Sequence, residues 1–366
     1  MNIPVAKVDL EESDLRRVEE VVRSGWIMQG PKVEAFERAI ADFCGARHAV
    51  AVTSGTTALH LMLHAAGIGL GDEVVVPSFS WIATANCVAY CGATPSFCDV
   101  DLASYNMTPP LAEAAITPRT KAILAVHQFG MPCDLDGFAR LARERGVMLF
   151  EDAACAIGSE SRGVRIGGFK SSVAACLSFH PRKVLTTGEG GMLLTNDAAL
   201  AEKVRQLRNH GLENGRFVEI GYNFRMTDLQ AALGIGQVAR LPETLAKRRA
   251  LAEVYRKELG GVAGLRLPEE ISGGCTNVQS FMVRFPEGGR TLRDRVASAL
   301  AARGIATRPG IAPIHLEPCY AKVCAGLRLP NTERLAGDGL VLPLYASLTP
   351  AKAVEISHAL LAALRA

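Results

Sequence analysis

The chain has 366 residues, a length that suggests two domains at about 150 residues each. Its composition, 49% apolar and 21% charged, is that of a globular protein and excludes a disordered chain. The formal net charge is only +3, and Lys and Arg are spread along the chain, so we expect no nucleic-acid partner. Apolar runs fall short of the ~18 residues of a membrane helix. The ten cysteines form no repeated C-x-x-C pair, so we expect reduced thiols, a cytoplasmic protein and no membrane partner.

Between about residues 48 and 196, short apolar or β-branched runs alternate with stretches of helical period. The predicted strands are, in chain order, Ala49–Thr53, Glu73–Pro77, Thr94–Val100, Lys121–His127, Val147–Glu151, Ser172–Ser178 and Met192–Thr195. The helices predicted between them include Thr57–Ala66, Ser80–Tyr90 and Leu135–Arg145. Continuous apolar strands separated by helices predict an α/β fold, with a mostly parallel sheet covered on both faces.

The pattern changes in the last third of the chain. Two more helices are predicted at Ala198–Asn209 and Thr227–Arg240, and a separate charged helix follows at Glu243–Leu259. A glycine-rich stretch and new strand-like runs come after it. We therefore expect a larger domain of residues 1–240 and a smaller C-terminal domain of residues 241–366.

The first of three candidate sites follows the first strand, because ligands of open α/β sheets bind at the carboxyl ends of strands. The chain there turns through Gly55 into a helix, whose N-terminal N–H groups and dipole favour a phosphate. The hydroxyls of Ser54, Thr56 and Thr57 could add donors. The alternative is that these residues only cap the helix.

The second candidate is Asp152, at the point where an apolar strand emerges from the sheet. Its carboxylate could hold a cationic ring nitrogen or a metal, or it could be a helix cap or a surface acid. The third is Lys183, between a strand and a glycine-rich turn that lacks the G-K-[ST] ending of a phosphate loop. A lysine in a partly buried pocket can attack aldehydes, whereas Arg182 beside it also suits an exposed basic loop. A phosphate cradle, an acid and a reactive lysine together are what pyridoxal phosphate requires.

The sequence resembles the DegT/DnrJ/EryC1/StrS family of sugar aminotransferases, which are fold-type I pyridoxal phosphate enzymes. The matching segments run nearly from end to end and are residues 24–31, 53–59, 77–101, 151–158, 178–191, 209–211, 221–234 and 342–348. The resemblance implies a large domain with a mostly parallel sheet between helices, a smaller C-terminal α+β domain, and pyridoxal 5'-phosphate as cofactor.

The resemblance also implies roles around the cofactor ring. Lys183 matches the lysine that forms a Schiff base with the cofactor and then moves the substrate proton, and Asp152 matches the acid that pairs with the ring nitrogen. Trp81 matches an aromatic residue on one face of the ring, although it could simply fill the core, and Ala154 matches a small residue on the other face. Cys155 departs from the family, which often has glutamine or histidine there against the ring hydroxyl, and a thiol is a weaker hydrogen-bond partner.

By the same resemblance, Gly55, Thr56 and Ser178 bind the cofactor phosphate. Asn223 matches an asparagine that the neighbouring subunit adds to that phosphate, which implies a homodimer with a shared active site. We expect no metal site: Cys87 and Cys91 lie four residues apart on a predicted helix, but no further ligand accompanies them in the sequence, so they are interpreted as small buried thiols.

The implied reaction moves an amino group from L-glutamate to a keto group of a nucleotide-linked sugar. His180, Arg308 and His315 are candidates for binding the substrate, with ordinary loop or core positions as the alternative. Two other activities remain open, a cyclitol aminotransferase and a sugar dehydratase. The dehydratases carry histidine in place of the lysine, so Lys183 argues against that reaction. A non-enzymatic regulator is the remaining alternative.

Overall fold

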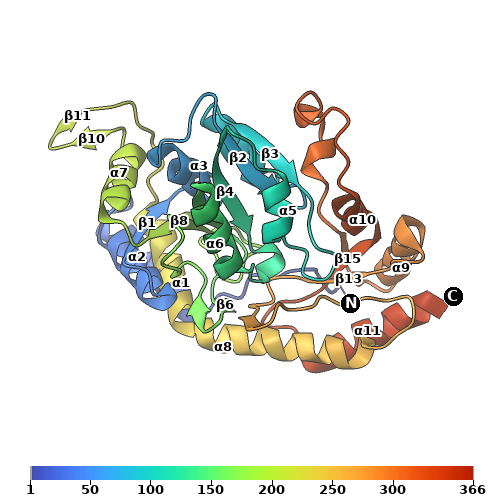
Figure 1. Cartoon of the computed structure of the whole chain (residues 1–366). Helices are drawn as coiled ribbons and strands as arrows, with labels where there is room; N and C mark the ends of the chain where they lie inside the picture. The colour runs from blue at the N-terminus through green and yellow to red at the C-terminus, as the bar shows by residue number, and fades with distance from the viewer. Residues whose placement is uncertain (1, 366) are drawn as a thin grey trace.

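The computed structural model describes residues 2–365, and its centre is a seven-stranded sheet in the order β1-β9-β8-β5-β4-β2-β3 (Figure 1). The strands are β1 (His48–Val52), β2 (Glu73–Pro77), β3 (Thr94–Cys98), β4 (Thr120–Val126), β5 (Met148–Asp152), β8 (Ala174–Ser178) and β9 (Gly191–Thr195). The neighbours from β3 to β8 pair in parallel, whereas β9 runs antiparallel to both β8 and β1. The mostly parallel sheet expected from the sequence is confirmed, and the predicted strand limits differ by at most two residues.

Helices cover both faces of this sheet. The helices α3 (Gly55–Ala65), α4 (Ala83–Tyr90) and α7 (Ala198–Arg208) pack on one face. The helices α2 (Pro31–Cys44), α5 (Pro109–Ala114) and α6 (Leu135–Arg145) pack on the other. Successive strand residues point to opposite faces. In β1, accordingly, Val50 and Val52 belong to the first core, and Ala49 and Ala51 to the second. This double burial explains why the strands are apolar without alternation.

The C-terminal part forms a smaller α+β layer, as expected. A three-stranded antiparallel sheet in the order β13-β15-β14 packs with three helices, at the right of Figure 1. These elements are β13 (Phe281–Arg284), β14 (Arg308–Pro309), β15 (Gly339–Leu342), α9 (Gly289–Ala302), α10 (Pro330–Asp338) and α11 (Pro350–Arg365). The start of the chain joins this part, because Ile3 makes a parallel bridge to Ile305.

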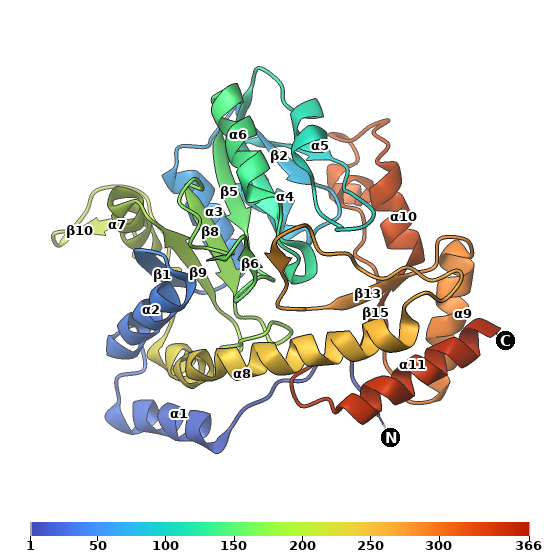
Figure 2. The ribbon, with the colours of Figure 1, turned by 60° about the horizontal axis from the view of Figure 1, so that its bottom comes forward.

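The expectation of two separate helices on either side of residue 241 is wrong. A single 32-residue helix, α8 (Asp228–Leu259), runs through that position with Pro242 inside it (Figure 2). The side chain of Leu241 belongs to the core beneath the large sheet, whereas Leu251 and Tyr255 belong to the C-terminal core. The helix therefore passes from one core to the other between residues 241 and 251, and the division into two domains at 240 stays a prediction.

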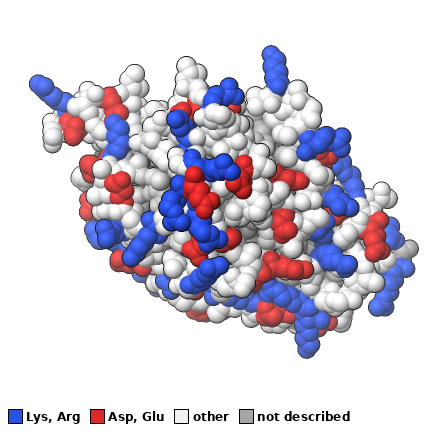
Figure 3. Space-filling model, in the orientation of Figure 1, with Lys and Arg blue, Asp and Glu red and all other residues white. Residues whose placement is uncertain are grey.

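The remaining elements are short or peripheral. They are α1 (Glu12–Ser24), β6 (Glu160–Ser161), β7 (Val164–Arg165), β10 (Leu212–Glu213), β11 (Arg216–Phe217) and β12 (Gly274–Cys275). The pairing of β12 with β6 joins the C-terminal part to the loop after β5. Figure 3 shows Lys and Arg interspersed with Asp and Glu on the face drawn there. Within residues 2–365, no helix combines the length and apolar character needed to cross a membrane.

Candidate active site

Three of the predicted site segments meet at one edge of the large sheet. Asp152 ends β5 and Ser178 ends β8, and these two strands are parallel neighbours. Because β1 and β8 both pair antiparallel with β9, they run in the same direction, so Gly55 follows β1 at this same edge. The topology therefore gathers the candidate acid and the candidate phosphate cradle, as expected for carboxyl ends of parallel strands.

Asp152 is buried, with 5% of its surface exposed, and three donors hold its carboxylate. Thr84 Oγ1 donates to Oδ2 at 2.8 Å, and the backbone N–H of Ala154 donates to Oδ1 at 3.2 Å. The Cys176 thiol approaches Oδ1 at 3.6 Å. Burial, and then the charge of Asp152, raises the pKa of that thiol well above its usual value, so it stays protonated and able to donate. The carboxylate is thus fixed in one orientation at the edge of the sheet.

Lys183 is half-buried, and its Nζ points at Cys155, with Nζ and Sγ 2.9 Å apart. Its backbone N–H donates to the carbonyl of His180 at 2.8 Å, which folds the loop after β8 back on itself. The C-terminal part holds Cys155 in place, because Asn277 Nδ2 donates to the carbonyl of Cys155 at 2.8 Å. The position that departs from the family is therefore in direct contact with the predicted reactive lysine.

The start of α3 combines a helix cap with free N–H groups. Ser54 Oγ accepts from the backbone N–H of Thr57 at 3.1 Å, so these two hydroxyl residues cap the helix. The first N–H groups of a helix have no acceptor within the helix, so those of Gly55 and Thr56 are left for an anion. A Cβ at Gly55 would lie 2.8 Å from Ser178 Cβ, which explains why glycine stands there. The space between this helix end and the Ser178 hydroxyl is a cradle of the kind that a phosphate fits.

Ala154 contacts the Asp152 carboxylate directly, and Trp81 is connected to it through Thr84. Thr84, which donates to Asp152, also donates its backbone N–H to the carbonyl of Trp81 at 3.0 Å. The side chain of Trp81 does not fill the core, because the residue is 68% exposed. An exposed indole can provide a stacking surface for a ring.

Two of the three candidate substrate residues lie near this site. The His180 ring accepts the backbone N–H of Arg182 at 3.2 Å, and its pKa is lowered, mainly by burial and also by the charges of Lys183 and Arg182. Arg308, in β14, also has a lowered pKa, mainly through burial and then through Arg182, and it interacts electrostatically with Cys155. Both basic side chains therefore border the region of Lys183.

The structure buries His315 against the residue that follows β2. The residue is 2% exposed, and its Nδ1 lies 2.7 Å from the hydroxyl of Ser78, which also accepts the backbone N–H of His315 at 3.0 Å. It ties the C-terminal loop to the end of β2 and has no open surface to offer a substrate. Burial also lowers the pKa of this histidine.

Asn223 belongs to a segment that pairs with the end of β1 through the bridge of Arg225 to Val52. It bridges to Asn209 and is exposed, whereas its neighbours Tyr222 and Phe224 stack on each other at 4.8 Å on the inner side. Within residues 2–365, its side chain makes no hydrogen bond to the other candidate residues.

Sequence reasoning missed Thr84 and Cys176, which hold Asp152, and Asn277, which holds Cys155. The available signal for Thr84 was its spacing of four residues from Ser80 near the start of a predicted helix; in the structure the two hydroxyls lie 2.7 Å apart. The assembled groups are an anion cradle, a fixed carboxylate, an exposed indole and a lysine amine. They fit a cofactor that carries a phosphate, a ring N–H and an aldehyde, as pyridoxal phosphate does.

Comparison with known proteins agrees with this fit. Residues 8–361 match the DegT/DnrJ/EryC1/StrS aminotransferase family. The chain is 42% identical to GDP-perosamine synthase of Caulobacter vibrioides over 98% of this chain and 97% of that one. DesV of S. venezuelae is 37% identical, with a TM-score of 0.92 over 98% of this chain and 97% of that one. The sugar aminotransferase Spr1654 of Streptococcus pneumoniae, described as putative and solved in its PLP form, is 26% identical, with a TM-score of 0.94 over 100% of this chain and 99% of that one.

Proposed function

This chain belongs to the DegT/DnrJ/EryC1/StrS aminotransferase family and is a pyridoxal phosphate-dependent sugar aminotransferase, and on that premise we propose its donor, its acceptor and the roles of its residues. The donor is L-glutamate, and the acceptor is the keto group of a nucleoside diphosphate-linked sugar. The observation that carries the proposal is the Lys183 amine held at one sheet edge with the Asp152 carboxylate and the cradle at Gly55.

When bound, pyridoxal phosphate supplies an aldehyde that bonds covalently to amines and a cationic ring that accepts electrons. Lys183 Nζ takes the proton from the amine-bearing carbon of the donor and later returns one to the acceptor carbon. General base catalysis requires the base to lie within hydrogen-bond distance of the proton. The half-buried Lys183 side chain, at the edge of the sheet, can lie at that distance from a bound donor. Cys155 Sγ, 2.9 Å from Nζ, orients the amine.

The other residues bind and orient. The Asp152 carboxylate holds the ring nitrogen in its protonated form, because an anion at that position favours the cation. Gly55, Thr56 and Ser178 bind the phosphate through N–H and hydroxyl donors, and Trp81 stacks on the ring. This division of labour is supported by the burial of Asp152 and the exposure of Trp81.

For the acceptor, a GDP-linked keto sugar is the first to test, because the relative that is 42% identical is a GDP-perosamine synthase. His180 and Arg308 stand near Lys183 and would meet the charged or hydroxyl groups of such a substrate. Arg is suited to bidentate contacts with phosphate oxygens. We give His315 no contact with the substrate, because it is buried against Ser78.

We also propose that the protein works as a homodimer in the cytoplasm. Asn223 would reach the cofactor phosphate of the partner. This is supported by its exposure, and by the apolar side chains Phe217, Val218 and Ile220 just before it, which are 73%, 53% and 90% exposed. Apolar groups exposed together are typical of protein interfaces. All ten cysteines are free, as suits a reducing compartment.

The test is turnover of a panel of nucleotide-linked keto sugars with L-glutamate, with formation of 2-oxoglutarate and of the amino sugar followed by mass spectrometry. We expect one GDP-linked keto sugar to be aminated. Lys183→Ala should lower kcat on the order of a thousandfold or more, because the group that moves the proton is removed. Lys170→Ala, which changes an exposed lysine elsewhere, is the matched control and should keep wild-type turnover. Full activity of Lys183→Ala would refute the assigned role, and activity only with other donors would refute L-glutamate.

A further inference from the structure

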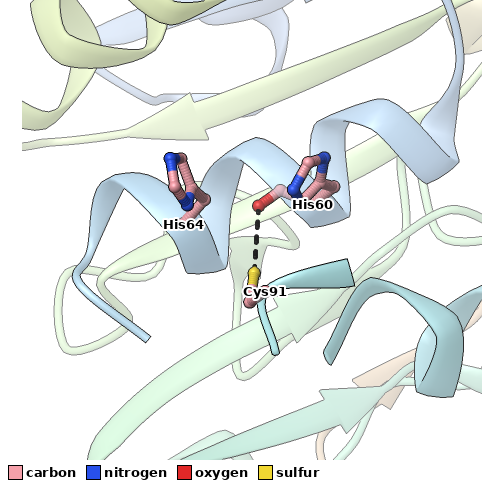
Figure 4. Close-up of side chains that lie close together, drawn as sticks. All are labelled: His60, His64 and Cys91. Atoms are coloured by element: carbon pink, nitrogen blue, oxygen red, sulfur yellow. Dashed lines mark hydrogen bonds between the residues drawn. The ribbon is translucent and has the colours of Figure 1, made fainter. Parts of the chain in front are cut away.

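Two histidines and a cysteine that the proposed reaction does not use come together beside α3 (Figure 4). His60 and His64 lie one turn apart on this helix, and Cys91 follows the last residue of α4. One ligand atom from each, an imidazole nitrogen or the thiol sulfur, lies within 4.8 Å of the other two. Figure 4 shows both rings on the same side of the helix, with the thiol approaching that turn.

The His60 ring is the buried member of this cluster. The residue is 7% exposed, and within residues 2–365 its Nε2 atom is buried without a hydrogen-bond partner. A buried polar nitrogen that lacks a partner is costly, so such an atom calls for a ligand that the structure does not contain. His64 and Cys91 are only half-buried, so an ion can enter from their side.

Aromatic rings surround the two imidazoles. The Tyr222 ring meets the His60 ring edge-on at 5.1 Å and the His64 ring at 6.0 Å. The Tyr90 ring contacts His60 at 5.8 Å, also edge-on. Two histidines four residues apart on a helix present their rings on one face. The helix α3 and its aromatic neighbours therefore bring the two imidazoles to the same side of the helix.

We propose that His60, His64 and Cys91 form a binding site for a Zn²⁺ ion, with a water molecule as the fourth ligand. Two imidazoles and one thiolate are a ligand set that Zn²⁺ accepts in tetrahedral geometry. The mixed nitrogen and sulfur donors exclude Mg²⁺ and Ca²⁺, which prefer oxygen. Neither the cofactor nor the proposed substrate takes part in this site, so a test of zinc binding is independent of a test of the proposed function.

Binding requires a small movement and the loss of one proton. In a tetrahedral site, Zn–N and Zn–S bonds of about 2.1 and 2.3 Å place the ligand atoms about 3.4–3.6 Å apart, so the half-buried His64 and Cys91 side chains have to move toward His60. Burial, and then His64, lowers the pKa of His60 to about 4, so its ring is already neutral at pH 7. Burial raises the pKa of Cys91 to about 11, so the thiol gives its proton to solvent when Sγ bonds to the ion.

The experiment titrates the cofactor-loaded protein with Co²⁺, which takes zinc sites and gives a near-ultraviolet charge-transfer band with a thiolate ligand. We expect one Co²⁺ per chain, such a band, and its loss when Zn²⁺ displaces Co²⁺. Cys91→Ser should abolish the band. His64→Gln should keep the band but weaken the affinity for Zn²⁺ by about tenfold or more, as measured by competition with a chromogenic chelator. Cys319→Ser, which changes an exposed cysteine elsewhere, is the control and should bind as the wild type does.

The His64→Gln variant keeps the test decisive even if Cys91→Ser fails to fold, because its changed side chain is half-buried. Zn²⁺ should also raise the Tm of the wild type and raise that of His64→Gln less, since an ion that binds only the folded chain stabilises it. The proposal is overturned if the wild type gives no thiolate band, or if His64→Gln binds Zn²⁺ as tightly as the wild type does.

Discussion

The carboxylate of Asp152 is held by residues that lie far from it in the sequence. Thr84 reaches it from α4 and Cys176 from β8, while the Ser80 hydroxyl lies beside that of Thr84. A carboxylate that accepts several hydrogen bonds is held in one orientation, so its remaining lone pairs point in a fixed direction, toward the proposed position of the ring nitrogen. Thr84 is therefore a positioning residue, which acts on the cofactor ring through Asp152.

Replacing Thr84 tests this role. Thr84→Val removes the 2.8 Å hydrogen bond to Asp152 and keeps the shape of the side chain. We expect kcat to fall about 10- to 150-fold, since a hydrogen bond to a charged group contributes about 1.5–3 kcal/mol, and the dissociation constant for pyridoxal phosphate to rise. Thr84→Ser keeps the hydroxyl and should recover most of both. Equal losses in the two variants would mean that packing at position 84, rather than the hydrogen bond, is what matters.

At the scale of elements, the sheet and its edge could be predicted, but the course of α8 could not. Apolar runs ending in Asp152 and Ser178 placed both residues correctly, because strand burial and strand ends are local signals. Pro242 suggested a break, since proline removes a helical hydrogen bond, yet packing of Leu241 and Leu251 on two cores keeps the helix continuous. Contacts such as that of Lys183 with Cys155 arise only when distant loops meet, and no spacing in the sequence encodes them.

The proline inside α8 has a measurable cost. Pro242 is exposed and cannot donate to the carbonyl of Val238, four residues earlier. Pro242→Ala supplies that N–H and should raise the free energy of unfolding by about 1–3 kcal/mol, measured by urea denaturation. Glu243→Ala, which changes the next exposed residue, should leave it nearly unchanged. A less stable Pro242→Ala would show that the proline fits a local bend that alanine loses.

The assembly is tested at the scale of the whole molecule by mixing inactive chains. In the proposed dimer, each site takes Lys183 from one chain and Asn223 from the other. A dimer of one Lys183→Ala chain and one Asn223→Ala chain therefore contains one intact site. When the two variants are co-expressed and assayed at limiting cofactor, their activity should exceed that of either variant alone. Each mixed dimer should reach up to about half of the activity of a wild-type dimer. If the two residues served the same chain's site, mixing would restore nothing.

The passage of α8 from one core to the other limits how relatives can be recombined. Leu241 has to fit the packing beneath the large sheet, and Leu245 fills the space over Gly158. Farther along the same helix, Leu251 and Tyr255 have to fit the C-terminal core. A chimera joined at residue 240 would graft a foreign helix half onto the first core, whereas a junction between residues 246 and 250 would leave Leu241 and Leu245 with the first core, and Leu251 and Tyr255 with the second. Gene fusions that exchange the C-terminal part are therefore best spliced inside this helix, about two turns beyond its proline.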